Sequence, residues 1–357
     1  MAARFLAVKQ SLWTDIQGGR FGRKLPPEPE LAKVYGVSRM TLRRSLAQLV
    51  GEGFLEAKPG QGTFVTDQRR SMGDTRTIGL LIGPYIGEVA EDAYFGVIFT
   101  TLAARFGAAG YMLTFATSAE HLAPAAPTIG ERVMRRPVDG VVAAAFDADS
   151  VWSVAGLRVP LVLANSNPLP GRSTVLPENR APILAIVQHL TGLGHRRMAH
   201  LTGSLSTVVA QERLLAWREG LALQHLAVDE SLILDGNFTI EFGYAAMGRL
   251  CALPGGPPTA VVCANDRMAL GVLRYAAEHG VKVPQEVSVI GFDDIDTAQH
   301  TTPTLSTVHV PRVDFADAVF RALVEDMESS AAEPSGRTIR VPTTMTLRGS
   351  TGPARSV

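Results

Sequence analysis

Eight short runs of almost continuously apolar residues, separated by stretches of helical pattern, constrain the fold of this chain more than any other feature. They occupy residues 78–82, 111–116, 138–145, 159–165, 197–203, 232–236, 260–265 and 287–294. Strands that are apolar on both faces are typical of parallel sheets covered by helices. So many strands over residues 77–350 favour two doubly wound lobes over a single sheet.

The ends of these runs carry the candidates for a binding site. In open α/β sheets, ligands lie beyond the carboxyl ends of the strands. The residues just past five of the runs are Asn165, Ser204, Phe238, Asn265 and Asp293. The pattern therefore indicates this edge of the sheets as the place where a ligand binds.

Charge is unevenly divided along the chain, although the formal net charge is zero. Residues 1–76 hold 13 Lys and Arg against 7 Asp and Glu, and the remainder holds 21 against 27. A basic head on a more acidic body fits a head that binds a polyanion.

The basic head has the pattern of three short helices followed by two strands. The first helix is predicted to end at Gly18 and Gly19, the second has its start marked by Pro26, Pro27 and Pro29, and the third runs from Arg39 to about Gly51 with Ser38 as its N-cap. Strand-like runs at 53–57 and 63–66 flank a glycine-containing loop, which completes a winged helix-turn-helix. The residues predicted to face inward are Phe5, Val8, Leu12 and Ile16, then Leu31, Val34 and Tyr35, then Leu42, Leu46 and Leu49.

The third helix is the predicted reader of DNA. A recognition helix places its N-terminal residues nearest the bases of the major groove, and an arginine fork can bind guanine through two hydrogen bonds. The side chains beside or opposite the core face of this helix are Arg39, Met40, Arg43 and Arg44.

Residues 25–66, LPPEPELAKVYGVSRMTLRRSLAQLVGEGFLEAKPGQGTFVT, resemble the DNA-binding head of GntR-type bacterial regulators. The resemblance rests on the VSRMTLRRSL segment and the GQGTFV wing, and it implies DNA contacts from Ser38, Arg39, Met40, Arg43, Gly60, Gln61 and Gly62. The family usually has Ser-Glu-Arg where this chain has Pro27-Glu28-Pro29. The usual serine cap and an arginine that reaches DNA are therefore absent.

Residues 77–350 resemble the effector domain of LacI/GalR regulators, which shares its fold with periplasmic sugar-binding proteins. The resemblance rests on VDGVV, HLTGLGHRRMAHLTG, ERLLAWREGL, PTAVVCANDRMALGVL, VSVIGFDD and PTLSTVHVP. It implies ligand contacts from Tyr94, Phe95, Asn165, Arg213, Phe238, Asn265 and Asp293. The family usually has Asp where this chain has Asn165, so the predicted pocket holds one carboxylate fewer. A GntR-type head on such a body resembles the arabinose-repressor type of chimeric regulator.

The fold class predicted is α/β, with an N-terminal winged helix-turn-helix and a two-lobed, doubly wound, periplasmic-binding-protein-like domain. We expect the winged helix at residues 1–67, a polar linker at 68–76, the ligand-binding domain at 77–350 and a tail at 351–357. Within the ligand-binding domain, we expect lobe 1 at about 77–168 and 305–330, and lobe 2 at about 169–302 and 336–350.

The predicted pocket residues suit vicinal hydroxyls. A carboxylate such as Asp293 accepts two hydroxyl donors, and the fork of Arg213 donates to two oxygens. Phe238, with Tyr94 or Phe95, can stack on the apolar face of a sugar ring. Together with the two resemblances, these residues predict a cytoplasmic repressor that leaves a roughly palindromic operator when a small neutral sugar binds, and the resemblance to LacI/GalR regulators implies a homodimer.

Other functions are less consistent with these residues. No signal peptide, membrane span or partnered nucleophile is visible, which disfavours a solute-binding protein and an enzyme. The spacings of His189, His195 and His200 do not favour a metal site, no nucleotide-binding loop motif is present, and we expect no cofactor. One alternative stays open, in which a corepressor such as a purine strengthens DNA binding.

Overall fold

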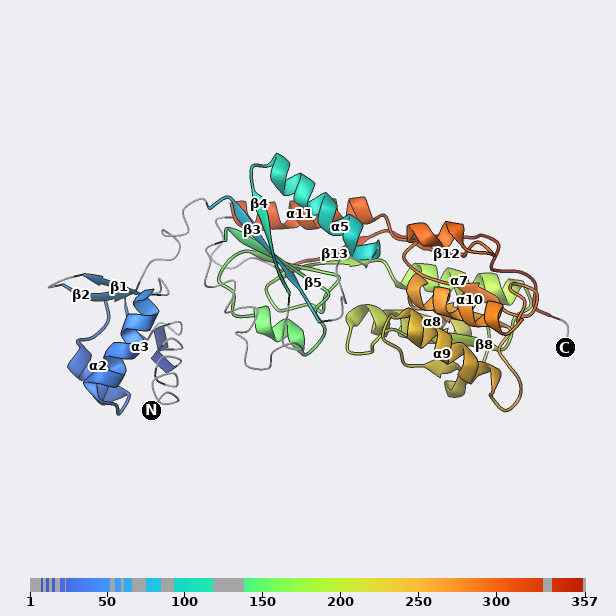
Figure 1. Ribbon diagram of the computed structural model, residues 1–357, viewed down its shortest axis with the longest axis horizontal. Helices are drawn as coiled ribbons and strands as arrows, with labels where there is room; N and C mark the ends of the chain where they lie inside the picture. The colour runs from blue at the N-terminus through green and yellow to red at the C-terminus, as the bar shows by residue number, and fades with distance from the viewer. Residues whose placement is uncertain are drawn as a thin grey trace. The chain divides into compact units, whose positions relative to one another are not determined.

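The computed structural model describes residues 8, 11, 12, 15, 16, 20–22, 24–51, 55–58, 61–65, 75–84, 93–117, 138–329 and 336–355. The chain divides into two compact units, Met1–Thr75 and Arg76–Val357 (Figure 1). The division falls at the end of the predicted linker 68–76, of which 68–74 lie outside the described residues.

The head contains the predicted helices and wing. Helix α2 (Glu28–Val34) and helix α3 (Arg39–Gly51) are followed by β1 (Leu55–Lys58) and β2 (Gly62–Val65). The two strands pair antiparallel, with Leu55 opposite Val65. Its core gathers the expected leucines together with the described residues of the first helix; these buried side chains are Val8, Leu12, Ile16, Leu31, Leu42, Leu46 and Leu49.

One inward-facing residue was predicted wrongly. The side chain of Val34 is 47% exposed, whereas Ala32 is buried. At about 100° per residue, Leu31, Ala32 and Tyr35 share one face of α2, and Val34 falls outside it. Phe5 lies outside the described residues.

The first lobe of the body is built on a six-stranded sheet in the order β13-β7-β6-β5-β3-β4, in which every pair is parallel. Helices α5 (Ala93–Ala108) and α11 (Arg312–Glu328) lie together on one side of it (Figure 1), and the turn η3 (Ser150–Val154) follows β5. The strands are β3 (Thr77–Ile82), β4 (Met112–Thr117), β5 (Gly140–Ala144), β6 (Leu161–Ala164), β7 (Ser173–Pro177) and β13 (Thr338–Val341).

The second lobe is built on a four-stranded parallel sheet in the order β11-β10-β8-β9. Helix α7 packs on α8, and α9 packs on α10. The strands are β8 (Met198–Leu201), β9 (Ile233–Leu234), β10 (Ala260–Cys263) and β11 (Ser288–Ile290). The helices are α7 (Arg180–Gly192), α8 (Val208–Leu223), α9 (Ile240–Cys251) and α10 (Asp266–Glu278), with 3₁₀ turns η4 (Glu230–Leu232) and η5 (Asp296–His300).

Two glycines let the backbones of α9 and α10 approach closely. A Cβ at Gly243 would lie 2.0 Å from the carbonyl oxygen of Met268, and a Cβ at Gly271 would lie 2.0 Å from that of Ile240. Only glycine fits at such contacts. The close crossing brings the first turns of the two helices together at the edge of the second sheet.

All eight predicted strands are present, but the predicted assignment of segments to lobes was wrong in three places. Strand β7 pairs with β6, and β13 pairs with β7, so residues 173–177 and 338–341 belong to the first lobe. Both segments were expected in the second lobe. Their polar residues and short length give no apolar run, and only the pairing across the sheet assigns them. The third segment is β12 (Thr307–His309), which was expected in the first lobe. It pairs antiparallel with β14 (Thr344–Thr346), and bridges join Ser306 to Ile290 and His309 to Asp293 of the second lobe.

Candidate functional site

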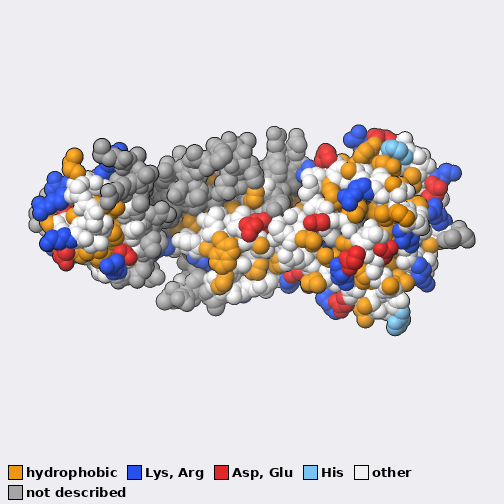
Figure 2. All heavy atoms as spheres, turned by 90° about the horizontal axis from the view of Figure 1, so that it is seen from below, with side chains coloured by type: hydrophobic (Ala, Val, Ile, Leu, Met, Phe, Trp, Pro, Cys, Tyr) orange, Lys and Arg blue, Asp and Glu red, His pale blue; other side chains and the backbone are white. Residues whose placement is uncertain are grey.

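The N-terminal end of α3 presents its polar side chains outward. The hydroxyl oxygen of Ser38 accepts a hydrogen bond from the backbone N–H of Thr41 at 3.2 Å, so Ser38 caps the helix as predicted. Arg39, Arg43 and Arg44 are exposed, and 82% of Met40 is accessible to solvent. Figure 2 shows that Lys and Arg side chains gather on the head.

The wing adds an exposed tip to this surface. Gln61 and Gly62 are exposed, and Gly62 has a φ of +110°, which favours glycine. Gly60 lies outside the described residues. The head therefore offers arginines from α3 and open backbone from the wing, which are the elements that a winged helix uses to bind DNA.

The body contains a cavity of about 500 Å³ between its two lobes. Ser204, which the strand ends also indicated, is not among its lining residues, but all seven residues that the resemblance implied as ligand contacts are. These are Tyr94, Phe95, Asn165, Arg213, Phe238, Asn265 and Asp293. The structure thus brings together side chains that lie as far apart in the sequence as residues 94 and 293.

The first turns of four helices surround this cavity, because each follows the carboxyl end of a parallel strand. Lining residues come from the starts of α5, α8, α9 and α10. Helix N-termini present backbone N–H groups and a partial positive charge. The cavity is therefore rich in hydrogen-bond donors, which suits a ligand with many oxygen atoms.

Arg213 is the buried cation of the cavity wall, with 3% of its surface exposed. Its Nε donates to Asn179 Oδ1 at 2.9 Å, its Nη1 donates to the carbonyl oxygen of Ala264, and its guanidinium lies 3.5 Å from the centre of the Phe292 ring. Burial lowers the pKa of the Arg213 guanidinium, and the nearby charge of Asp293 acts in the opposite direction. Among the described residues Arg213 forms no ion pair, so no carboxylate in direct contact neutralises the guanidinium. Its positive charge is therefore available to a ligand oxygen.

Backbone strain is concentrated around the cavity. Four of its lining residues are non-glycine residues with positive φ, namely Ala145 (+59°), Asn165 (+50°), Phe238 (+64°) and Asp293 (+115°). Such conformations persist where the surroundings enforce them, and they cluster at functional sites. In addition, the buried Oδ1 atom of Asn165 has no hydrogen-bond partner among the described residues, so it is an acceptor that a ligand can satisfy.

Two of the predicted contacts have structural roles as well. Asn265 Oδ1 accepts from the backbone N–H of Met268 at 2.9 Å and so caps α10, while its Nδ2 donates to the carbonyl oxygen of Phe238 at 3.0 Å. The ring of Phe238 lies on Gly203, where an added Cβ would be 1.8 Å from the ring Cζ. Asn265 and Gly203 therefore hold Phe238 in its place on the cavity wall.

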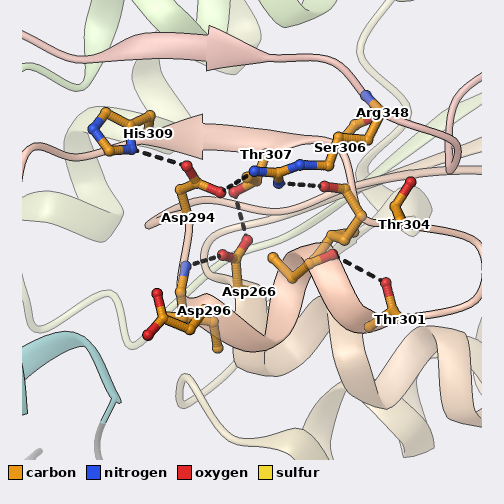
Figure 3. A network of polar contacts seen from close by, with 12 residues as sticks. Asp266, Asp294, Asp296, Thr301, Thr304, Ser306, Thr307, His309 and Arg348 are labelled. Atoms are coloured by element: carbon orange, nitrogen blue, oxygen red, sulfur yellow. Dashed lines mark hydrogen bonds and ion pairs between the residues drawn. The ribbon is translucent and has the colours of Figure 1, made fainter.

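Asp293 belongs to a loop that a polar network anchors (Figure 3). Its neighbour Asp294 accepts from His309 Nδ1 at 2.9 Å and from Arg348 Nη2 at 2.6 Å. Beneath it, Asp266 accepts from Thr307 Oγ1 at 2.5 Å and from the N–H of Ile295 at 2.9 Å. Burial raises the pKa of Asp266 to about 7, and these two hydrogen bonds act against the rise.

The start of α11 joins the two lobes through Arg312. Its Nη1 donates to the carbonyl oxygen of Ala93 in the first lobe at 3.1 Å, and its Nη2 donates to that of Asp294 at 3.0 Å. Ala93 lines the cavity, and Asp294 follows a residue that does. Arg312 therefore fixes two cavity loops that belong to different lobes.

Sequence reasoning missed a second connection between the lobes. Asn167, which follows β6, donates through Nδ2 to the carbonyl oxygen of Ser206 at 3.3 Å and accepts at Oδ1 from the backbone N–H of Val208 at 2.8 Å. The N–H of Ala148 donates to the same Ser206 oxygen at 3.0 Å. Since Thr207 makes no side-chain cap, Asn167 of the first lobe caps α8 of the second.

Other lining residues were also missed. Half of them lie in the loops that follow the strands, and the other half lie in the helices and 3₁₀ turn that these loops lead into. The rule that ligands lie beyond strand ends could have indicated these loops, but not which side chain points inward. The additional lining residues are Pro84, Ala93, Ala145, Thr207, Val209, Asn237, Thr239, Ile240, Arg267, Leu270, Ile295 and Thr297.

Two of the three histidines considered for a metal site have other contacts, whereas the buried Nε2 of His189 has no hydrogen-bond partner among the described residues. His195 Nδ1 lies 2.9 Å from Thr259 Oγ1, and its Nε2 lies 3.0 Å from the carbonyl oxygen of Gly352. His200 is buried, with Nδ1 3.0 Å from the carbonyl oxygen of Val262 and its ring stacked on Trp217. Within the described ranges no group of three or more His, Cys, Asp or Glu could hold a metal ion, and no helix is long and apolar enough to cross a membrane.

Known proteins resemble both units of the chain. Residues 187–351 match the periplasmic binding protein-like domain family, and residues 6–65 match the gntR family of bacterial regulatory proteins. The HTH-type transcriptional repressor CytR of Escherichia coli (strain K12) is 31% identical over 283 residues, which cover 78% of this chain and 80% of CytR.

Solved structures show the same fold. The complex of the transcriptional regulator CelR with cellobiose has a TM-score of 0.70 and 24% identity, and it covers 91% of this chain and 100% of that one. A sugar-binding transcriptional regulator of the LacI family from Escherichia coli, solved with phosphate, has a TM-score of 0.63 and 26% identity over 78% of this chain and 99% of its own.

Proposed function

The chain belongs to the LacI family of transcriptional repressors and carries a GntR-type DNA-binding head, and we propose that it leaves its operator when a small sugar enters the cavity of the body. The observation that carries this proposal is the convergence of the seven predicted ligand contacts on one cavity between the lobes. It is an effector-responsive repressor and not an enzyme, as its relatives are repressors.

On the DNA side, the proposal assigns base and phosphate contacts to the N-terminal half of α3 and to the wing. Arg39, Arg43 and Arg44 supply the positive charge, and Ser38 and Met40 lie at the same helix end. In the wing, the proposal assigns contacts with the sugar-phosphate backbone of DNA to Gly60, Gln61 and Gly62. An arginine fork distinguishes guanine in the major groove, and the other cations contribute through the release of counterions from DNA.

On the ligand side, the proposal assigns hydroxyl recognition to the polar lining and ring stacking to the aromatic lining. Arg213 and the four helix N-termini donate, Asp293 and the unpartnered Asn165 Oδ1 accept, and Phe238 offers a flat apolar face. A pocket of mostly apolar walls with a few placed polar groups is typical of small-molecule sites. The LacI-family regulator with 26% identity is described as sugar-binding, which supports the same class of ligand here.

The link between the two sites requires a conformational change. A ligand that contacts both lobes favours the closed body, and it can release DNA only if the closed body binds DNA less well. We propose a cytoplasmic homodimer whose two heads bind the half-sites of a roughly palindromic operator, because closure then alters the relation between the heads.

A thermal-shift screen of the full chain against neutral mono- and disaccharides and purines tests the proposal. A ligand at 100 times its Kd stabilises the folded state by about 2.7 kcal/mol. A sugar that raises the melting temperature and weakens operator binding supports the proposal. A purine that raises the melting temperature and strengthens operator binding would replace it with the corepressor alternative, and stabilisation by no sugar would contradict it.

A further inference from the structure

The recognition helix carries an ion pair that the sequence did not indicate. The Nε of Arg43 on α3 donates to a carboxylate oxygen of Glu28 on α2 at 2.7 Å. The side chain of Arg43 remains 71% exposed in this pair, and that of Glu28 is 35% exposed. Arg43 is therefore held at its inner nitrogen while most of its side chain faces solvent.

The outer end of the guanidinium is unoccupied. Within the part of the chain that the structure describes, neither Nη1 nor Nη2 of Arg43 has a hydrogen bond. These two nitrogens form the fork that can donate to O6 and N7 of guanine. A carboxylate at Nε leaves this fork intact and limits the directions in which it points.

The position of Glu28 at the start of α2 favours its ion pair with Arg43. Glu28 is the first residue of α2, where the helix dipole favours a carboxylate, and it lies between Pro27, whose φ is −56°, and Pro29. The two prolines restrict the backbone on either side of it. An ion pair this exposed contributes little to folding, so its main effect is on the orientation of Arg43.

We propose that Glu28 is a positioning residue for Arg43, which orients the arginine fork for one guanine of the operator. The inference rests on the proposed role of Arg43 in base recognition. Glu28 lowers the net positive charge of the head by one and so weakens its general attraction for phosphate. At the same time it increases the discrimination between bases at one position of the operator. The two effects have opposite signs, so they can be measured separately.

The experiment uses the full chain and operators selected from random duplex DNA. The guanine that Arg43 reads is located first, as the position at which Arg43→Ala loses discrimination between guanine and adenine. Glu28→Gln is then compared with Glu30→Gln, an equal charge change on the same short helix at a residue that, in the described part of the head, forms no hydrogen bond or ion pair with Arg43. Glu28→Asp keeps the charge but withdraws the carboxylate by one methylene.

We expect Glu28→Gln to lower discrimination at this guanine by roughly three- to tenfold, the factor associated with holding one flexible side chain in place, while affinity for unrelated DNA rises. Glu30→Gln should raise affinity for unrelated DNA without a loss of discrimination. Glu28→Asp should lose discrimination without that rise. Unchanged discrimination in Glu28→Gln would overturn the positioning role, whereas unchanged discrimination at every guanine in Arg43→Ala would overturn the proposed base contact itself.

Discussion

Replacing Asn167 with alanine tests whether the two lobes are held together around the cavity by the cap that the first lobe provides for α8. The substitution removes the hydrogen bonds from Val208 N–H at 2.8 Å and to the Ser206 carbonyl oxygen at 3.3 Å. The bond from Ala148 N–H to Ser206 remains. Val208 is the first residue of α8, and its N–H has no partner within the helix.

The magnitude follows from these two bonds. Each neutral hydrogen bond contributes roughly 0.5–1.5 kcal/mol. The closed body, in which Asn167 caps α8, therefore loses roughly 1–3 kcal/mol of stability relative to an open body in which the two lobes are apart. A change of 1.4 kcal/mol is about tenfold in an equilibrium constant. A sugar that binds the closed body should therefore bind Asn167→Ala about tenfold more weakly, because a smaller fraction of the protein is competent to bind it.

Hydrogen exchange measures the effect directly and needs no ligand. In Asn167→Ala the amide of Val208 should exchange about tenfold faster, whereas amides in the middle of α8 should keep their protection. Asn237→Ala is the matched control, because Asn237 also lines the cavity but, among the described residues, its Oδ1 accepts hydrogen bonds only from Thr239 within its own lobe. Equal protection of Val208 in wild type and Asn167→Ala would refute the inter-lobe cap.

Two further substitutions test the cavity and the core beneath it. Gly203→Ala places a Cβ 1.8 Å from the Phe238 ring, so we expect the ring to move, the sugar affinity measured by calorimetry to fall at least tenfold, and the operator affinity to stay unchanged. In the control Gly192→Ala, a Cβ would meet nothing within 4 Å, so both affinities should stay at their wild-type values. Normal sugar affinity in Gly203→Ala would show that Phe238 does not contact the ligand. Burial lowers the pKa of His200 to about 4, below the value of about 6.5 in an unfolded chain. The neutral imidazole therefore contributes roughly 3 kcal/mol to the free energy of unfolding above pH 6.5, and this contribution is lost as the pH falls to 4. Denaturant titrations over this range should show a smaller loss of stability for His200→Gln, and identical pH profiles would exclude His200 as a source of acid sensitivity.

Much of the fold could be predicted from the sequence because its signals are local. Runs such as residues 260–263 are apolar on both faces, and a parallel sheet is the usual structure that buries such a strand. The α3 core was likewise predictable from the spacing of Leu42, Leu46 and Leu49. Because parallel strands end at one edge, the same reasoning brought residues such as Asn165 and Asp293 to one cavity.

What could not be predicted depends on how elements that are separate in the sequence pack against one another. Strands β7 and β13 lie next to each other although some 160 residues separate them, as the pairing of Thr174 with Thr338 shows, and no local pattern encodes that pairing. The cap of Asn167 on α8 and the ion pair of Glu28 with Arg43 have the same origin. Each joins two elements whose relative positions are set only by tertiary packing.

Operator release in the Arg213→Ala variant is the most direct test of the claim that a ligand in the cavity controls DNA binding. Fluorescence anisotropy of a labelled operator is measured with the full chain as the stabilising sugar from the thermal-shift screen is added. Arg213 lies outside the DNA-binding head, so the variant should bind operator with wild-type affinity. Loss of a hydrogen bond to a charged group costs about 1.5–3 kcal/mol, so the variant should need at least tenfold more sugar to release the operator. Release of Arg213→Ala at the wild-type sugar concentration would contradict the account.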